Sequence, residues 1–313
     1  MLNFTLTQLR YLVAVDQYRH FAKAAKHCAI SQPTLSMQLQ KLEDCLGAPL
    51  FDRSKQPVVP TPIGCVVIAQ ARTVLREADR IVEVIESEKE GLRGEYRLGI
   101  IPTLTNGVLP LFVPAFARSY PEVTLIIEEM KTEHLLEALK DDRIDGALAA
   151  TPLDDPQIEE QPVLYERFFA YLSKGHPLLE KKSVQESDLE KHSVWLLGEG
   201  HCFRNQVTQL CGKKRVQNHV VFESGTFETL VSLVDQGMGM TLLPELLISK
   251  ISNKKQLREL GTRHAFREVS LIRHRHMVRA AITKALQECI QKNLPKGIQT
   301  QLQNGLVLDP LAS

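Results

Sequence analysis

Two helices joined by a tight turn constrain the first sixty residues more than any other feature of this sequence. A short helical stretch with an alanine pair, Phe21–Lys26, permits another helix to pack closely. Ser31 then supplies an N-cap, Pro33 fits the first turn of the next helix, and Gly47 ends that helix. Leucines recur every three or four residues along this helix and define its inward face: Leu35, Leu39, Leu42 and Leu46.

The opposite face of this helix is polar and suits the major groove of DNA, where glutamine, serine and threonine hydrogen-bond base edges. Downstream, residues 50–59 predict a small β wing, whose Arg53 and Lys55 would touch phosphates or the minor groove. Residues 1–60 hold seven Lys and Arg against four Asp and Glu, so this segment has a net charge of +3, whereas the whole chain has a net charge of +1. On the pattern alone, a three-helix module that binds only other proteins is the alternative.

The order of residues narrows these alternatives. The stretch FAKAAKHCAISQPTLSMQLQKLEDCLGAPLFDRSKQPVVPTPIG resembles the DNA-binding domain of the LysR family, with its alanine pair and its SQP-x-x-S, LE-x-x-LG, LF-x-R and T-x-x-G elements. The resemblance implies an all-α winged helix-turn-helix at residues 1–60, which binds double-stranded promoter DNA as a dimer. It implies a transcription regulator rather than an enzyme, with RNA polymerase as a further partner. The residues placed on DNA are Gln32, Pro33, Thr34, Ser36 and Gln38 in the groove and Arg53 on the wing.

A long linker helix should follow, from the cap pair Thr61 and Pro62 to about Gly91. Its apolar residues step by three or four, through Val67, Ala71, Val74, Ala78, Ile81 and Ile85. A seam this regular favours self-association through residues 61–91 over packing against the helix's own domain. The LysR resemblance further suggests a tetramer made from two dimers.

From Glu95 onward, strand and helix patterns alternate, which is typical of a parallel sheet covered by helices. The first set has strands at Tyr96–Ile101, Val123–Ile127 and Gly146–Ala150 and helices at Leu109–Ser119 and from Thr132. The second set has strands at Arg167–Leu172, Val194–Leu197 and Val220–Phe222, helices from Phe203 and Phe227, and a return through Val269–Ile272 and Met277–Lys292. With the resemblance, this predicts a two-lobed α/β effector domain at 92–313, similar to periplasmic binding proteins. Lobe I would span about 92–166 and 269–313, and lobe II about 167–268.

Two threonines are candidates for the cleft between these lobes. Thr103 follows the first strand and Thr132 is expected to cap a helix. Ligand sites in open α/β sheets lie beyond the carboxyl ends of the strands, and helix N-termini there favour anions. Simple capping is the alternative role for both hydroxyls.

Cys202 has the setting of a reactive thiol. It lies where a glycine-containing loop enters a helix, beside His201 and near Arg204, and helix N-termini and positive neighbours favour the reactive thiolate. Cys211 follows nine positions later. Two core thiols, or a zinc site that adds His201 and His219, are the alternatives from spacing alone. Four cysteines lie in or near apolar helical sequence and are expected to be packing residues: Cys28, Cys45, Cys65 and Cys289.

The segment GHCFRNQ, the second cysteine and the downstream SGTFETLVSLVDQGMGMTLLP resemble the OxyR group of the LysR family, over nearly the whole chain. The resemblance implies a sensor in which hydrogen peroxide oxidises Cys202 and Cys211 resolves it to a reversible disulfide. No metal or cofactor is implied, and glutathione or thioredoxin-type reductants would reset the pair. The residues implied at the peroxide are Thr103, Thr132, His201, Arg204 and Arg273.

Rival functions share parts of this pattern. A LysR regulator that binds a small organic anion would make both cysteines incidental, a thiol peroxidase would use Cys202 for turnover, and a scaffold would use neither. No apolar run reaches the roughly 20 residues that span a bilayer, and the N-terminus lacks a signal-peptide core, so a cytoplasmic protein is expected.

Overall fold

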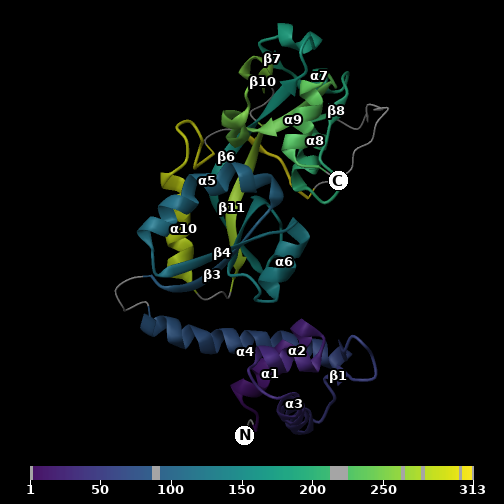
Figure 1. Cartoon of the computed structure of the whole chain (residues 1–313), viewed down its shortest axis with the longest axis vertical. Helices are drawn as coiled ribbons and strands as arrows, with labels where there is room; N and C mark the ends of the chain where they lie inside the picture. The colour runs from purple at the N-terminus through teal and green to yellow at the C-terminus, as the bar shows by residue number, and fades with distance from the viewer. Residues whose placement is uncertain are drawn as a thin grey trace. The chain divides into compact units, whose positions relative to one another are not determined.

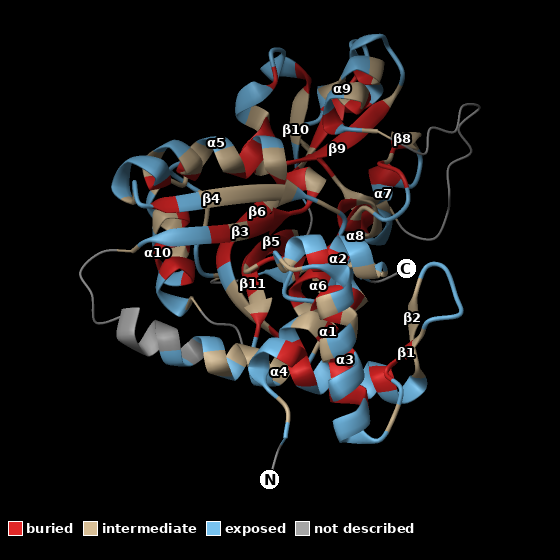
Figure 2. Cartoon of the chain, turned by 60° about the horizontal axis from the view of Figure 1, so that its bottom comes forward, coloured by how far each residue is buried: buried red, intermediate tan, exposed pale blue. Residues whose placement is uncertain are grey.

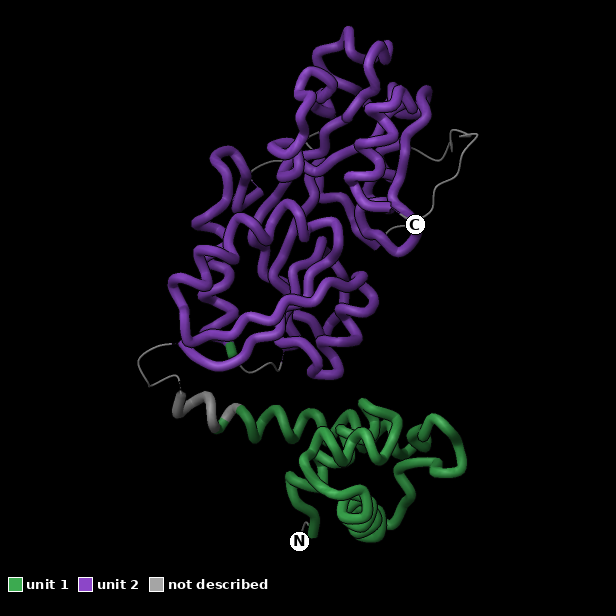
Figure 3. The backbone as a smooth tube through the Cα atoms, viewed as in Figure 1, with its two compact units in different colours: residues 1–90, 276–279 green, residues 91–275, 280–313 purple. Residues whose placement is uncertain are grey.

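The computed structural model describes residues 3–86, 92–211, 225–261, 265–275, 279–302 and 305–311. The chain forms two compact units, residues 1–90 with 276–279 and residues 91–275 with 280–313 (Figure 3). The strand predicted at Val220–Phe222 lies outside the described residues. Within the described parts of the chain, no helix is long and apolar enough to cross a membrane.

A helical bundle with a small hairpin builds the N-terminal unit (Figure 1). Its elements are α1 Leu6–Tyr18, α2 Phe21–His27, α3 Gln32–Leu46, β1 Phe51–Asp52, β2 Val59–Pro60 and α4 Pro62–Glu86. Ser31 caps α3, because its Oγ accepts a hydrogen bond from Thr34 N at 3.3 Å. Gly47 ends α3 with a φ of +71°, and β1 pairs antiparallel with β2. The predicted winged helix-turn-helix is confirmed.

The core of this unit follows the predicted leucine pattern with one exception. Leu35, Leu39 and Leu42 are fully buried on α3, whereas Leu46 is 38% exposed because the helix ends beside it. Cys45 and Cys65 are exposed too, so the expectation that they pack in the interior was wrong. Both lie on helix positions outside the buried face, where a small thiol needs no apolar partner.

Some residues of the predicted apolar seam on α4 pack against the N-terminal unit itself, and others are exposed. Ala71 is buried with Ile68 in the N-terminal core, and Val67 packs against that core. Val74 and Ile81 are exposed, Ile81 by 67%. The first half of α4 therefore stabilises the helix-turn-helix, and the apolar stripe without a partner in this unit includes Val74 and Ile81.

The first lobe of the C-terminal unit is a sheet with helices on both faces. β3 Gly94–Ile100 pairs in parallel with β4 Val123–Glu129 and β5 Gly146–Thr151, as the alternating pattern predicts. α5 Pro102–Ser119 and α10 Ala280–Lys292 cover one face, and α6 Thr132–Lys140 covers the other (Figure 1). The helix predicted to start at Leu109 begins earlier because Pro102 suits a first turn.

Two long antiparallel strands connect the lobes, β6 Ile158–Leu172 and β11 Ala265–His274. In the second lobe, the end of β6 lies between two antiparallel neighbours, β9 and β10. The other elements of this lobe are β7 Ser183–Val184, β8 Val194–Trp195, β9 Met240–Pro244, β10 Leu257–Leu260, α7 Glu186–Leu189, α8 Cys202–Cys211, α9 Phe227–Asp235 and short 3-10 helices at Pro177–Glu180, Glu245–Lys250 and Lys254–Gln256.

Each lobe has its own apolar core beneath an exposed outer surface (Figure 2). α10 packs on the first lobe, as predicted for the returning segment. The residues after it do not: β12 Leu306–Val307 pairs in parallel with β11, and Leu308 is buried in the core of the second lobe. Residues 305–311 therefore belong with lobe II rather than lobe I, because the side chain of Leu308 fits against α8.

Candidate redox and DNA-binding sites

Cys202 begins α8 where the two lobes meet, and its nearest charged partner is an arginine. Cys202 Sγ lies 3.8 Å from Arg267 Nη2, and only 6% of the residue is exposed. The same Nη2 donates to Thr103 Oγ1 at 2.5 Å. A guanidinium is always charged in proteins and stabilises a neighbouring thiolate. Arg267 therefore joins Thr103 of the first lobe to Cys202 of the second.

Arg267 is anchored although it is fully buried. Its Nη1 donates to Glu166 Oε1 at 3.3 Å, and Glu166 Oε2 accepts from Leu246 N at 3.2 Å. Its Cζ lies 5.4 Å from the centre of the Phe203 ring, which is a cation–π distance. Burial raises the pKa of Glu166, and the Arg267 charge opposes that effect. The strands β6 and β11, which carry this pair, thus set the position of the guanidinium.

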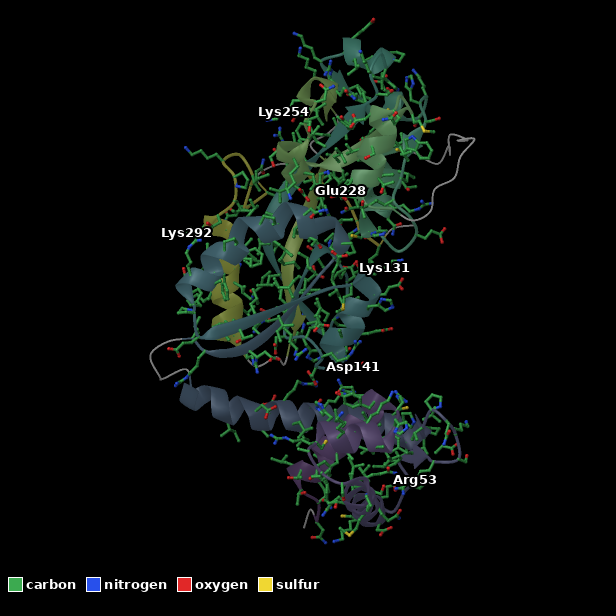
Figure 4. All side chains as sticks on the ribbon, viewed as in Figure 1. Arg53, Lys131, Asp141, Glu228, Lys254 and Lys292 are labelled. Atoms are coloured by element: carbon green, nitrogen blue, oxygen red, sulfur yellow. The ribbon has the colours of Figure 1, made fainter. Side chains whose placement is uncertain are left out.

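The loop before α8 packs against the beginning of α6. Lys131 Nζ donates to Glu199 O at 3.0 Å, and Lys131 lies at the junction of the lobes (Figure 4). Gly200 has a φ of +83°, a backbone conformation that favours glycine, and a Cβ there would also displace the Lys131 side chain, whose Nζ would lie 2.8 Å away. Burial first, and then the Lys131 charge, lower the pKa of His201. His201 Nδ1 is buried without a hydrogen-bond partner in the described structure, so a small ligand could satisfy it.

A second set of contacts closes the other side of the junction. Asn106 Nδ2 donates to Glu228 Oε1, and Lys250 Nζ donates to Asn106 O. Glu228 lies in the first turn of α9, near the junction of the lobes (Figure 4), and Asn106 belongs to α5. These bonds hold the lobes together around the buried thiol.

Cys211 ends the same helix that Cys202 begins. Both are free thiols, and nine residues of helix separate their Cα atoms by about 13.5 Å. Cys211 is half-buried against the second-lobe core, and burial raises the pKa of its thiol to about 12. Cys202 has a cation beside it and Cys211 has none of the described charges beside it, so the two thiols differ chemically.

The structure places the two predicted threonines differently from a simple cap. Thr103 is buried in the first turn of α5 and touches Arg267. Thr132 is the first helical residue of α6, and Lys131 is the N-cap, so the prediction that Thr132 caps the helix was wrong. Thr132 is buried in the first turn of α6, one position after Lys131, whose Nζ bonds to the loop that carries His201.

Two arginines predicted at the site have other partners. Arg204 Nη1 donates to Leu197 O at 2.8 Å, which ties α8 to the loop that follows β8. Arg273 forms a two-pronged ion pair with Glu159 at 2.9 and 3.0 Å. It lies six residues along β11 from Arg267, a separation of about 20 Å in an extended strand. The arginine at the thiol is Arg267. Nothing in the sequence distinguished it, because β11 also carries Glu268 and Arg273.

The predicted DNA-contacting residues of α3 differ in how far their side chains are exposed. Gln32 and Pro33 are exposed at the start of α3, and Thr34 and Ser36 are half-buried. Gln38 accepts a hydrogen bond from Gln8 Nε2 at 3.2 Å, which orients its side chain against α1. The start of α3 is therefore the most accessible part of the predicted reading surface.

Arg53 has a structural role within the N-terminal unit. Its Nη2 donates to Glu43 Oε2 at 2.6 Å, and its Cζ lies 5.3 Å from the centre of the Phe21 ring. Glu43 Oε1 also accepts from Leu50 N at 2.7 Å. This network joins α3 to the wing, and the side chain of Arg53 remains 40% exposed for a phosphate.

No group of three or more potential metal ligands occurs among the described residues. His219, which the zinc alternative needs, lies outside them.

Comparisons with known proteins agree with this architecture. The family described as "Bacterial regulatory helix-turn-helix protein, lysR family" matches residues 6–65, and "LysR substrate binding domain" matches residues 89–295. The chain is 34% identical to the hydrogen peroxide-inducible genes activator of Haemophilus influenzae over 80% of this chain and 83% of that protein. It is 34% identical to the DNA-binding transcriptional dual regulator OxyR of Escherichia coli over 78% and 80% of the two chains.

Solved structures extend the likeness to three dimensions. A full-length OxyR cysteine-to-aspartate variant from Pseudomonas aeruginosa is 33% identical with a TM-score of 0.80, over 93% of this chain and 99% of that one. A hydrogen-peroxide-bound cysteine-to-serine mutant of Corynebacterium glutamicum OxyR is 30% identical with a TM-score of 0.61, over 92% of both chains.

A winged helix-turn-helix carried with a two-lobed α/β domain defines a DNA-binding transcription regulator rather than an enzyme. The chain belongs to the LysR family of bacterial transcription regulators, and within that family it is OxyR-like.

Proposed function

We propose that this regulator senses hydrogen peroxide through Cys202 and converts the signal into a disulfide with Cys211. The observation that carries the proposal is the Arg267 guanidinium 3.8 Å from Cys202 Sγ, at a helix N-terminus. The thiolate is the nucleophile in thiol oxidation, and a fixed positive charge beside the sulfur stabilises the negative charge that moves onto the leaving oxygen. The similarity to hydrogen peroxide-inducible activators supports the choice of oxidant.

The first step breaks the O–O bond. The Cys202 thiolate attacks one peroxide oxygen and becomes a sulfenic acid, and the other oxygen leaves as hydroxide. Thr103 and the unpartnered His201 Nδ1 are polar groups placed to hold peroxide or the leaving oxygen. Thr132, which is buried at the start of α6 next to Lys131, is assigned the same role. Because Cys202 is 94% covered, a two-oxygen molecule reaches it more readily than bulky oxidants do.

The second step converts the oxidation of Cys202 into a change of backbone structure. Cys211 thiol condenses with the sulfenic acid, which forms the S–S bond and releases water. A disulfide needs Cα atoms within about 7 Å, so α8 must unwind before the bond closes. Glutathione or thioredoxin-type dithiols then reduce the bond and restore the helix.

The DNA-reading end is proposed to respond through oligomer geometry. The exposed stripe at Val74 and Ile81 pairs two chains, and two such dimers form a tetramer. The remodelled second lobe changes how subunits pack, and thereby the spacing of the α3 helices on promoter DNA. RNA polymerase is the partner through which the oxidised form activates genes of the oxidative-stress response.

Mass spectrometry and footprinting of one sample test the proposal. Substoichiometric peroxide should give a Cys202–Cys211 disulfide in the wild type and a trapped sulfenic acid in Cys211→Ser. The DNA footprint should change in the wild type and should not change in Cys211→Ser. Cys289→Ser is the matched control, since Cys289 is a half-buried thiol of the first lobe, and it should behave like the wild type. A footprint that still responds to peroxide in Cys202→Ser would refute the scheme and favour an organic anion as effector.

A further inference from the structure

The segment 305–311 packs along α8, the helix that has to unwind. Three side chains of this helix donate to three successive carbonyl oxygens of the segment. Asn205 Nδ2 reaches Pro310 O at 3.1 Å, Gln206 Nε2 reaches Leu308 O at 2.9 Å, and Gln209 Nε2 reaches Asp309 O at 2.5 Å. Gln206 and Gln209 follow Asn205 by one and four positions. In a helix these three side chains project from one side, and they do so only while α8 is helical.

The other edge of the segment is fixed next to the site arginine. Leu306 and Val307 pair with Ala265 and Phe266 of β11, and Leu308 N donates to Phe266 O at 2.9 Å. Arg267, the next residue, is the one that touches Cys202. The segment therefore spans from the strand that carries the guanidinium to the helix that carries the thiol.

Buried apolar and polar side chains both strengthen the contact between residues 305–311 and α8. Leu308 is 4% exposed, in the same core as Phe203 and Leu210 of α8. Gln206 is fully buried, and its Oε1 has no partner in the described structure, whereas its Nε2 is used by Leu308 O. A buried amide oxygen without a partner costs free energy, and the hydrogen bond from Nε2 to Leu308 O offsets part of that cost. Holding the segment is the role that the contacts give Gln206.

We propose that residues 305–311 form a strap that holds α8 helical beside Arg267 in the reduced protein and leaves it when the disulfide forms. The inference rests on the proposed Cys202–Cys211 chemistry. Unwinding of α8 moves Asn205, Gln206 and Gln209 off their common face, so the three bonds are lost together. By linkage, a strap that is released by the disulfide must also oppose its closure.

Hydrogen exchange on the full-length protein tests release directly. The Leu308 amide bonds to Phe266 O while the Leu308 side chain is buried in the core with Phe203 and Leu210 of α8. It should therefore be protected in the reduced protein and should exchange at least tenfold faster once unwinding of α8 removes that packing and releases the segment. In Cys211→Ser, where oxidation stops at the sulfenic acid, protection should persist. A wild-type sample whose mass shows the disulfide but whose Leu308 amide stays protected overturns the strap and leaves the sensing proposal standing. A sample in which Cys202 is never oxidised overturns both.

The rate of closure gives an independent test. The triple variant Asn205→Ala, Gln206→Met and Gln209→Ala keeps good helix formers but removes all three donors. Conversion of sulfenic acid to disulfide should be at least fivefold faster than in the wild type, as measured by quenched-flow mass spectrometry. Thr208→Ala is the control, because among the described residues Thr208 Oγ1 bonds to Arg204 O, within α8, and not to the strap. An unchanged or slower closure in the triple variant contradicts the proposal.

Discussion

Arg267 Nη2 lies 3.8 Å from Cys202 Sγ and 2.5 Å from Thr103 Oγ1, so one buried guanidinium connects the thiol to the opposite lobe. The arrangement gives Cys202 a cation that solvent cannot screen. It also makes the reactivity of the thiol depend on how the two lobes are held.

Arg267→Gln should slow the formation of sulfenic acid at Cys202. A charge-assisted hydrogen bond is worth about 1.5–3 kcal/mol, which corresponds to roughly a 10- to 100-fold lower rate constant. Stopped-flow fluorescence of Trp195, the only tryptophan in the sequence, can follow the reaction. Arg273→Gln is the control on the same strand, and a similar loss in both variants would show that the cation is not specific.

Replacing Glu166 alone should destabilise the protein more than replacing both Glu166 and Arg267. Glu166→Gln leaves a fully buried cation without its carboxylate and should lower the free energy of unfolding by about 3–5 kcal/mol. The double variant Glu166→Met, Arg267→Met should recover much of that loss, because neither charge is then buried. Urea unfolding of the reduced proteins measures both. Additive losses in the double variant would mean that the pair is not coupled.

Cys211 should make the reduced protein sensitive to alkali. Its thiol has a pKa of about 12 in the folded protein, raised from 9.0 by burial. A raised folded pKa means that its stabilising contribution is complete below pH 9 and is lost as pH rises toward 12. Thermal unfolding of wild type and Cys211→Ala over pH 8 to 11 should therefore show a steeper alkaline decline in the wild type. Parallel declines would contradict a buried, neutral Cys211.

The recognition helix and the wing should separate DNA affinity from stability. Gln32→Ala removes an exposed side chain at the start of α3 and should weaken promoter binding by about 1–3 kcal/mol without changing the melting temperature. Arg53→Ala leaves the nearly buried Glu43 without its ion-pair partner and should lower the melting temperature as well. Gel shifts and thermal melts on both variants check this contrast. An Arg53→Ala protein as stable as wild type would show that its role is confined to DNA.

The exposed stripe of α4 should control self-association. Val74→Glu with Ile81→Glu puts charges where two helices are proposed to meet, so the protein should elute as a smaller species in light-scattering chromatography. Met238→Glu, at an exposed apolar residue of the second lobe, should leave the assembly unchanged. Disruption by Met238→Glu alone would point to a different interface.

Local patterns in the sequence were sufficient for much of this protein. The spacing from Leu35 to Leu42, the Ser31 cap and Gly47 define α3, because helix ends and buried faces follow from neighbours within a few turns. The position of Cys202 at a helix start was also predictable, since a loop entering a helix is a local event. The family resemblance supplied the candidate roles of Cys202 and Cys211.

Only the tertiary structure decided what surrounds the thiol. Cys202 and Arg267 are separated by 65 positions, and Arg267 and Thr103 by 164, so no periodic pattern links them. The choice of Arg267 over Arg273 depends on the register of β11 against β6, which long-range pairing sets. The same holds for residues 305–311: their sequence shows no motif, and they acquire a partner because β12 pairs with β11 beside α8.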